Sequence, residues 1–131
     1  MSYLEDARAF FKADYFATET TGITIDEVEL GYAKCSLTIA QKHMNAGNMV
    51  MGGAIFTLAD FAFGIAANAG QPMTITLNST ISYLGVAKGK RLLAEARVIK
   101  AGRSTCVVTV EVSDELGTPV AIATMTGFRK S

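Results

Sequence analysis

The sequence predicts an α+β domain in which an antiparallel sheet wraps around one long central helix. Residues 51–68 are almost all apolar and long enough for one helix, whereas residues 73–129 contain strand patterns separated by short turns. A run of strands with a segregated helix is typical of an antiparallel sheet. Because a helix that is apolar on nearly every side must be covered all round, we expect the sheet to curl about it.

The N-terminal part is expected to contain one helix and two strands. Apolar side chains recur near helical spacing in residues 3–17, which predicts an amphipathic helix that ends before Gly22. Residues 23–29 then predict the first strand. After a turn at Gly31, residues 33–39 alternate between apolar and polar side chains, as a half-buried strand does.

The remaining elements follow a loop and the long helix. Residues 41–50 are expected to form this loop, with His43, the only histidine, at the surface. The long helix comes next, and Gly70 and Pro72 terminate it. Turn residues then separate four further strands, which are predicted at 73–84, 91–100, 104–112 and 119–129.

Composition indicates one folded domain that spans residues 1–131, because the chain shows no linker or repeat. Hydrophobic residues make up 50% of the chain and charged residues 18%, which excludes a disordered polypeptide. Lysine and arginine number 12, as do aspartate and glutamate, and this balance argues against nucleic acid as a partner. A small monomer must cover its surface with polar groups. Such an apolar composition, together with zero net charge, therefore predicts that part of the surface lies in an interface between subunits.

No membrane span, metal site or cofactor is expected. Four Gly or Thr positions, Asp60 and Asn68 interrupt the apolar stretch at 51–69, so it is not a membrane span. The first residues lack the basic and apolar regions of a signal peptide, and we therefore expect a cytoplasmic protein. Two isolated cysteines and one histidine do not form a zinc ligand set.

Gly52 and Gly53 lie where the long helix is expected to begin. The first backbone N–H groups of a helix have no partners within it, and a glycine has no side chain that blocks their approach. Amides in this position, at the positive end of the helix dipole, stabilise a developing oxyanion. The alternative interpretation is that the glycine pair only permits close packing at the start of the helix.

Asp60 is the only charged residue of the predicted helix, and it shares a helix face with Thr57 and Gly64. A buried carboxylate is costly unless it is paired, and its pKa tends to rise. Asp60 is therefore interpreted in two ways. It is a hydrogen-bond anchor between the helix and a strand, or it is a nucleophile or general base tuned by burial.

Helix geometry separates these two groups. Eight residues along one helix place Gly52 and Asp60 roughly 12 Å apart. An oxyanion donor and an attacking group must both lie about 3 Å from the reacting carbonyl, so one chain cannot supply both to one substrate. Two antiparallel copies related by a twofold axis can do so. The sequence thus predicts at least a homodimer, and we expect a dimer of dimers, which is a homotetramer.

The segment that carries these residues resembles a known signature. Asn45, Gly52-Gly53 and Leu58-Ala59-Asp60 are spaced as in the PaaI-like acyl-CoA thioesterases of the hotdog-fold superfamily, relatives of the 4-hydroxybenzoyl-CoA thioesterases. The order of the expected elements also resembles the hotdog fold over about residues 5–129. The resemblance implies a thioester hydrolase with acyl-CoA as its substrate.

The resemblance also implies roles for single residues. Asp60 would attack the thioester or activate water, and the Gly52 N–H of the opposite subunit would polarise the thioester carbonyl. Asn45 would hold the nucleophilic carboxylate or the water. Thr76 falls where some relatives carry a hydroxyl that helps to position the water.

One position departs from the signature, because Met51 replaces its histidine and a thioether cannot donate a hydrogen bond. Met51 is expected to pack against the acyl chain or the thioester sulfur instead. The other candidate substrate-binding residues are Gly53, Phe56, Lys88 and Arg103. The two cations lie at turns, where they either meet the phosphates of coenzyme A or are simply solvated.

Two functions of different class follow. The first is an acyl-CoA thioesterase, in which Asp60 and the Gly52 amide act across a dimer interface. The alternative is a non-catalytic hotdog module that binds acyl-CoA or another acyl ligand. A hotdog dehydratase or hydratase is not favoured, because that chemistry normally uses a histidine together with a carboxylate.

Overall fold

The computed structural model describes residues 2–130 of the chain. Within these residues, six strands form one antiparallel sheet in the order β1-β2-β4-β5-β6-β3. The elements, in chain order, are α1 (Tyr3–Phe11), η1 (Phe16–Thr21, a π-helix), β1 (Ile23–Glu29), β2 (Tyr32–Thr38), η2 (Gln41–His43, a 3-10 helix), α2 (Gly52–Asn68), β3 (Thr74–Tyr83), β4 (Arg91–Ala101), β5 (Thr105–Asp114) and β6 (Pro119–Arg129). The predicted α+β class and antiparallel sheet are confirmed.

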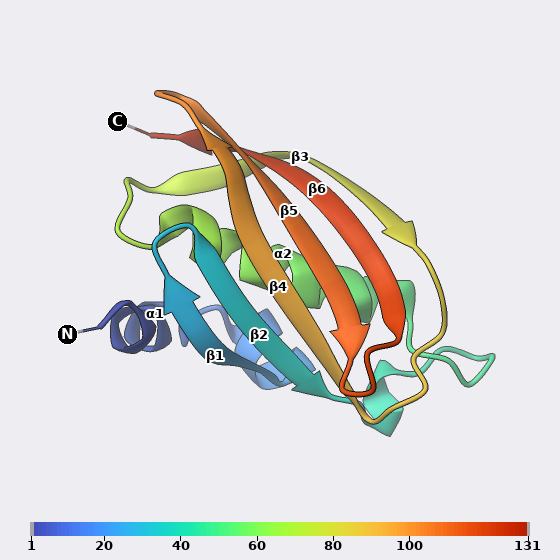
Figure 1. Cartoon of the computed structure of the whole chain (residues 1–131). Helices are drawn as coiled ribbons and strands as arrows, with labels where there is room; N and C mark the ends of the chain where they lie inside the picture. Colours follow the sequence, from blue (N-terminus) through green and yellow to red (C-terminus); the bar gives the residue numbers. More distant parts are fainter. Residues whose placement is uncertain (1, 131) are drawn as a thin grey trace.

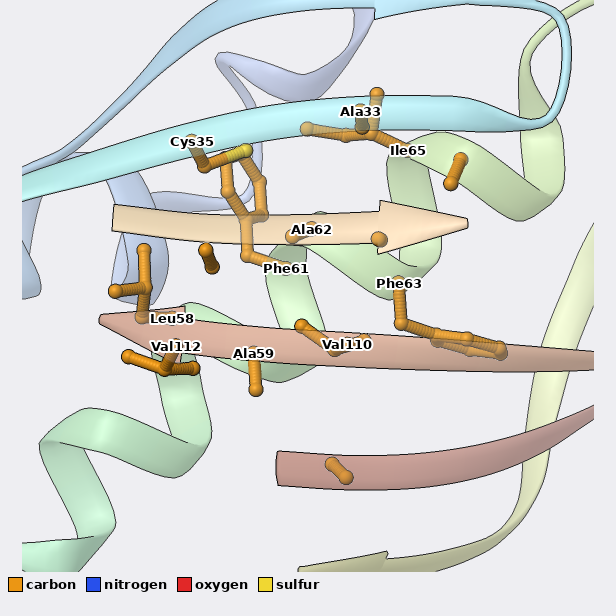
Figure 2. Close-up of a cluster of buried hydrophobic side chains, with 14 of the residues drawn as sticks. Ala33, Cys35, Leu58, Ala59, Phe61, Ala62, Phe63, Ile65, Val110 and Val112 are labelled. Carbon is orange, nitrogen blue, oxygen red and sulfur yellow. The ribbon is translucent and has the colours of Figure 1, made fainter. Parts of the chain in front are cut away.

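The sheet curves over α2, and α1 lies beside β1 (Figure 1). Leu58, Phe61 and Phe63 of α2 point into the core, where they meet small or branched side chains of the strands (Figure 2). Gly127 of β6 shows how close this packing is. A Cβ atom there would lie 2.6 Å from Thr74 Cγ2 and 3.1 Å from Phe63 Cζ, so only glycine fits.

The sequence had led us to expect that α2 would be covered all round. Within the single chain, the sheet leaves one side of the helix open. A stripe of small and polar residues with helical spacing stays partly open within the single chain: Gly53, Thr57, Asp60, Gly64 and Asn68. None of these residues carries a large apolar side chain, so leaving them open costs little hydrophobic energy. The apolar faces of α2 are buried, and its polar stripe faces away from the sheet.

The first helix is shorter than predicted. It ends at Phe11 rather than near residue 17. The chain then winds again into a separate π-helix, η1, which ends at Gly22, where φ is +84°. The hydroxyl of Thr18 donates to the carbonyl of Asp14, and such side-chain hydrogen bonds compete with regular helix. This rewinding buries Ala17 and Thr21.

The turn between β5 and β6 is organised by Asp114, whose side chain is buried. Its carboxylate accepts backbone N–H groups of Lys88, Gly89, Leu116 and Thr118 at 2.8–3.0 Å. Burial alone would raise the pKa of this carboxyl, but the N–H donors outweigh it and hold the pKa well below its usual range. Asp114 therefore ties the β3–β4 connection to the β5–β6 turn.

We expect Asp114→Asn to lower the thermal midpoint at pH 7 by at least about 5 °C, because hydrogen bonds to a charged acceptor are about twice as strong as neutral ones. A depressed pKa in the folded state stabilises the fold above the unfolded pKa, near pH 4, and this contribution is lost as pH falls further. Thermal unfolding followed by circular dichroism at pH 7 and pH 3 measures this. The gap between wild type and variant should narrow at pH 3, and an unchanged gap would contradict the charge-based account.

Candidate active site along helix α2

A pocket of about 420 Å³ opens at the start of α2. It is lined by Asn45, Met49, Val50, Gly52, Ile55, Tyr83, Leu84, Gly85, Val86, Ala87 and Val120, and we call it the α2 N-terminal pocket. Met51 is the residue before the helix, and its carbonyl accepts the N–H groups of Ala54 and Ile55. Among residues 2–130, the N–H groups of Gly52 and Gly53 have no such partner. In the part of the chain that the structure describes, the Gly52 N–H, which the sequence proposes as the oxyanion donor, is therefore not used in a backbone hydrogen bond.

Gly52 also fits the alternative interpretation given above. A Cβ atom at Gly52 would lie 3.2 Å from the ring of Tyr83, so the glycine allows this aromatic side chain to approach the helix. The Tyr83 hydroxyl donates to the Gly52 carbonyl at 3.1 Å. Close packing and an open amide thus coexist at one residue.

The loop before α2 is shaped by Asn45. Its side-chain oxygen accepts the N–H groups of Gly47 and Met49, at 2.9 and 3.1 Å. The backbone closes the same turn through a bridge between Met44 and Val50, and Asn48 adopts a φ of +61°. This loop lies at the same end of the sheet as the β3–β4 connection and the β5–β6 turn (Figure 1). Asn45 therefore lines the pocket with Gly52 and also holds the loop in shape.

A second pocket, of about 650 Å³, lies beside Asp60. We call it the Asp60 pocket. Its polar lining includes Asp60, Thr57 and Thr76, so two residues that the sequence singled out, Asp60 and Thr76, share it. Much of the rest is aromatic or apolar: Phe10, Phe11, Tyr15, Phe16, Phe61, Phe63, Met73 and Ile75. The pocket joins the open stripe of α2 to β3 and to the end of α1.

Asp60 is half-buried, and burial raises the pKa of its carboxyl. The negative charge of Asp14, which lines the same pocket, raises it further. Burial also raises the pKa of Asp14. Within residues 2–130 no hydrogen bond or cation lowers the pKa of Asp60. This does not favour the interpretation of Asp60 as a hydrogen-bond anchor, and it leaves a carboxylate of raised basicity in a pocket.

The four candidate catalytic residues fall into two groups in one chain. Asn45 and Gly52 share the α2 N-terminal pocket, Asp60 and Thr76 share the Asp60 pocket, and no residue lines both. Gly52 and Asp60 belong to one continuous helix, which keeps them roughly 12 Å apart along its axis. A single chain thus holds the four candidate catalytic residues in two separate places.

The candidate substrate-binding residues are more scattered. Met51 is 54% exposed and lies beside Gly53, whereas Phe56 packs partly against the core. Lys88 is exposed and follows the pocket residue Ala87 directly. Arg103, also exposed, lies in the turn at the opposite end of β4. An eleven-residue strand is about 35 Å long, so Lys88 and Arg103 of one chain do not meet.

Three residues near these pockets were not expected from the sequence. The prediction that His43 lies at the surface is wrong, because His43 is only 5% exposed and its ring hydrogen-bonds to the carbonyl of Thr21, the last residue of η1. Tyr83 lies at the end of a strand, and no sequence pattern indicates its contact with Gly52. Asp14 was assigned to an ordinary helix, and the rewinding of the chain places it beside Asp60. Only His43 offered a signal in the sequence, because it is the single histidine of the chain and lies in a short loop.

Two general features of the described chain bear on partners. In residues 2–130, no helix combines the length and the apolar character needed to cross a membrane. Over the same residues, His, Cys, Asp and Glu side chains form no group of three or more suited to a metal ion.

Known proteins resemble this chain in both sequence and fold. A family model described as Thioesterase superfamily matches residues 47–121. A putative esterase of Archaeoglobus fulgidus is 35% identical over 79% of this chain and 68% of its own. The acyl-coenzyme A thioesterase PaaI of Escherichia coli is 31% identical over 90% of this chain and 84% of its own.

Solved structures show the same likeness. The E. coli PaaI protein from the phenylacetic acid degradation operon superposes with a TM-score of 0.88 at 26% identity, covering 99% of this chain and 97% of its own. A hypothetical thioesterase protein from Streptococcus pneumoniae, solved with coenzyme A, gives a TM-score of 0.85 at 26% identity. That match covers 92% of this chain and 97% of the other. The six-stranded antiparallel sheet with one long helix is thus shared with these proteins.

Proposed function

This chain belongs to the thioesterase superfamily and has its hotdog fold, and from that premise we propose that it hydrolyses acyl-CoA thioesters in a site shared by two copies of the chain. One observation carries the shared site. Asn45 and Gly52 line one pocket, Asp60 and Thr76 line another, and both pockets lie on the same rigid helix. An antiparallel second copy brings the Asp60 half of one chain to the Gly52 half of the other.

The chemistry follows from the groups that each half contains. The Gly52 N–H donates to the thioester carbonyl oxygen and stabilises the negative charge that develops there. The Asp60 carboxylate, made more basic by burial, attacks the carbonyl carbon or removes a proton from the attacking water. Asn45 and Thr76 position that carboxylate or water. When Asp60 acts as a base, the C–S bond breaks to give the free acid, and the proton taken from water passes to the departing thiolate of coenzyme A. When Asp60 attacks directly, C–S cleavage leaves a mixed anhydride on its side chain and the thiolate takes a proton from solvent. Water then hydrolyses the anhydride to the free acid and restores the Asp60 carboxylate.

The surface beside Asp60 favours a second copy of the chain. Strand β3 forms one edge of the sheet, and edge strands present unpaired backbone groups that readily pair with another strand. Its side chains Ile75 and Leu77 are 48% and 58% exposed, and the open stripe of α2 lies alongside. Joining two β3 edges would cover these apolar residues and bring the two α2 stripes together.

A further association into a tetramer is part of the same proposal. The outer face of the sheet exposes Ile99, Ile122 and Phe128, which are 64%, 39% and 38% exposed. Apolar side chains on that face, among which Phe128 lies directly opposite Ile75 of β3, support a second contact between copies of the chain. Light scattering is expected to find a dimer or a dimer of dimers, and a stable, fully active monomer would contradict the shared site.

Substrate contacts outside the catalytic groups are assigned on position. Met51, Gly53 and Phe56 lie at the start of α2, where we propose that they contact the acyl or thioester portion. Lys88, next to the α2 N-terminal pocket, is proposed to meet the phosphates of coenzyme A. Because Arg103 lies at the other end of β4, it is expected to contact coenzyme A only at a site built with a different copy.

The function is tested with a panel of acetyl-, octanoyl-, palmitoyl- and benzoyl-CoA, following release of the free thiol. Wild-type protein should hydrolyse at least one of them, and binding without turnover would support the non-catalytic module instead.

The shared site is tested by co-expressing Asp60→Asn and Gly52→Pro chains with different tags and purifying the mixed oligomers. Each mixed dimer would contain one intact site, so activity should return well above that of either variant alone.

Met51 marks the departure from the family signature, and we expect Met51→His to lower kcat/KM by about three- to tenfold on the best acyl-CoA. Met49 and Val50 make this neighbourhood apolar, so a histidine covered by the second copy would be a poorly satisfied polar group. The measurement compares kcat/KM of both proteins on the same substrate. A clear gain with histidine would show that the native chain is a weakened enzyme and would favour the binding module.

A further inference from the structure

The ring of His43 is buried, and both of its nitrogens are used. Nδ1 lies 2.9 Å from the backbone nitrogen of Ala40, and Nε2 lies 2.7 Å from the carbonyl oxygen of Thr21. A backbone N–H only donates, so Nδ1 is the acceptor and the ring hydrogen is on Nε2, where it donates to Thr21. The neutral imidazole therefore joins the end of η1 to the start of η2.

The backbone of His43 makes the next link. Its carbonyl oxygen accepts the N–H of Met51 at 2.8 Å. Met51 directly precedes Gly52, so this bond sets the backbone from which the Gly52 N–H projects. The bridge between Met44 and Val50 closes the loop between these two anchored ends. Through the hydrogen bonds of its ring and of its backbone carbonyl, His43 anchors this loop to the rest of the fold.

The first residues of η1, Phe16 and Ala17, line the Asp60 pocket, and its last residue, Thr21, accepts the bond from His43. The start of α2 has no side-chain cap that would fix it independently, because Met51 makes no capping hydrogen bond. The position of the Gly52 amide thus depends on the loop before it more than is usual at a helix start. His43 is the buried polar side chain that holds this loop.

We propose that His43 is a positioning residue for thioester hydrolysis, which holds the Met51 backbone and through it aims the Gly52 N–H at the substrate carbonyl. This inference rests on the proposed function, because it assigns His43 to the oxyanion half of the shared site. His43 does not touch the substrate and exchanges no proton with it.

The first test separates positioning from packing. His43→Phe keeps a ring of similar size and removes both nitrogens, whereas His43→Gln offers one acceptor and one donor in their place. We expect His43→Phe to lose about 10- to 100-fold in kcat with little change in KM, as for a displaced catalytic group. His43→Gln should recover most of that loss. Lys42→Gln, an exposed neighbour in η2, is the matched control and should keep wild-type kcat.

Outcomes of this test decide the assignment. Wild-type kcat in folded His43→Phe would overturn it, and so would a Gln variant no better than Phe. Should the Phe variant fail to fold, the Gln variant still decides. A folded Gln protein with kcat as low as that of Gly52→Pro contradicts the proposal, and a near-wild-type kcat supports it.

The second test asks which half of the site His43 serves. In oligomers that mix His43→Phe with Asp60→Asn chains, one site combines the intact Gly52 half of one chain with the intact Asp60 half of the other. Activity should therefore return, as with the Gly52→Pro and Asp60→Asn pair. If that reference pair recovers activity and the His43 pair does not, His43 serves the Asp60 half or the whole fold, and the inference is wrong. If the reference pair also fails, the shared site itself is wrong.

Discussion

Replacing Asp60 with Asn is expected to reduce kcat for acyl-CoA hydrolysis by about 10²-fold or more, the loss typical of removing an acid–base group. Asn preserves the shape of the side chain but cannot attack a thioester or accept a proton from water. As the pH is lowered, kcat should fall because the Asp60 carboxylate becomes protonated. Burial and the charge of Asp14 raise the pKa of Asp60, so this acid limb of the wild-type pH profile should begin at a higher pH than it would for an ordinary aspartate. That acid limb should be absent from any residual activity of the variant.

Thermal unfolding is the control for this variant. A pKa raised in the folded state means that ionised Asp60 opposes folding at pH values above its unfolded pKa. Asp60→Asn removes that charge, so its thermal midpoint at pH 7 should equal or exceed that of wild type. Loss of activity with undiminished stability identifies a chemical role. If Asn at this position left hydrolysis unchanged, the enzyme proposal would fail and the acyl-binding module would replace it.

Gly52→Pro should cost about 10²–10³-fold in kcat, the range found when one oxyanion donor is removed. Proline deletes the N–H while suiting the first position of a helix, where its fixed φ is already helical. Met51, with φ −64° and ψ 138°, has the extended conformation that a residue before proline prefers. The substitution therefore removes the proposed donor with little demand on the backbone.

Gly52→Ala is the matched control, because alanine keeps the N–H but brings a similar Cβ atom against Tyr83. The Tyr83 side chain is 52% exposed and has room to move, so the alanine variant should retain most of the wild-type kcat. Steady-state kinetics on the best acyl-CoA compare the two variants. Equal losses in both would assign the effect to crowding of Tyr83 and contradict the oxyanion role of the amide.

Features that depend on neighbours in the sequence were predicted well. The boundaries of β1, β4 and β6 fall within one residue of those expected, and α2 begins one residue later than predicted and ends where predicted. Alternation and helical spacing are local properties, since a side chain's direction follows from its own position in a strand or helix. The separation of Gly52 and Asp60 was predictable for the same reason, because one helix contains both.

Contacts between distant segments were not predictable in this way. His43 meets Thr21 across 22 residues, and Tyr83 meets Gly52 across 31. The break after α1, which places Asp14 near Asp60, also depends on how η1 packs. Such contacts arise only when the chain is folded, and no local periodicity encodes them.

The sequence by itself thus determined the fold class, the central helix and the two groups on it that one chain cannot bring together. Tertiary structure decided the rest: two separate pockets, the place of Asp14 beside Asp60 and the hydrogen bonds by which His43 anchors the loop before Gly52. The physical reason is that helix geometry follows from covalent spacing and local hydrogen bonds. Burial, pKa and loop position instead depend on which distant side chains the fold packs around a residue.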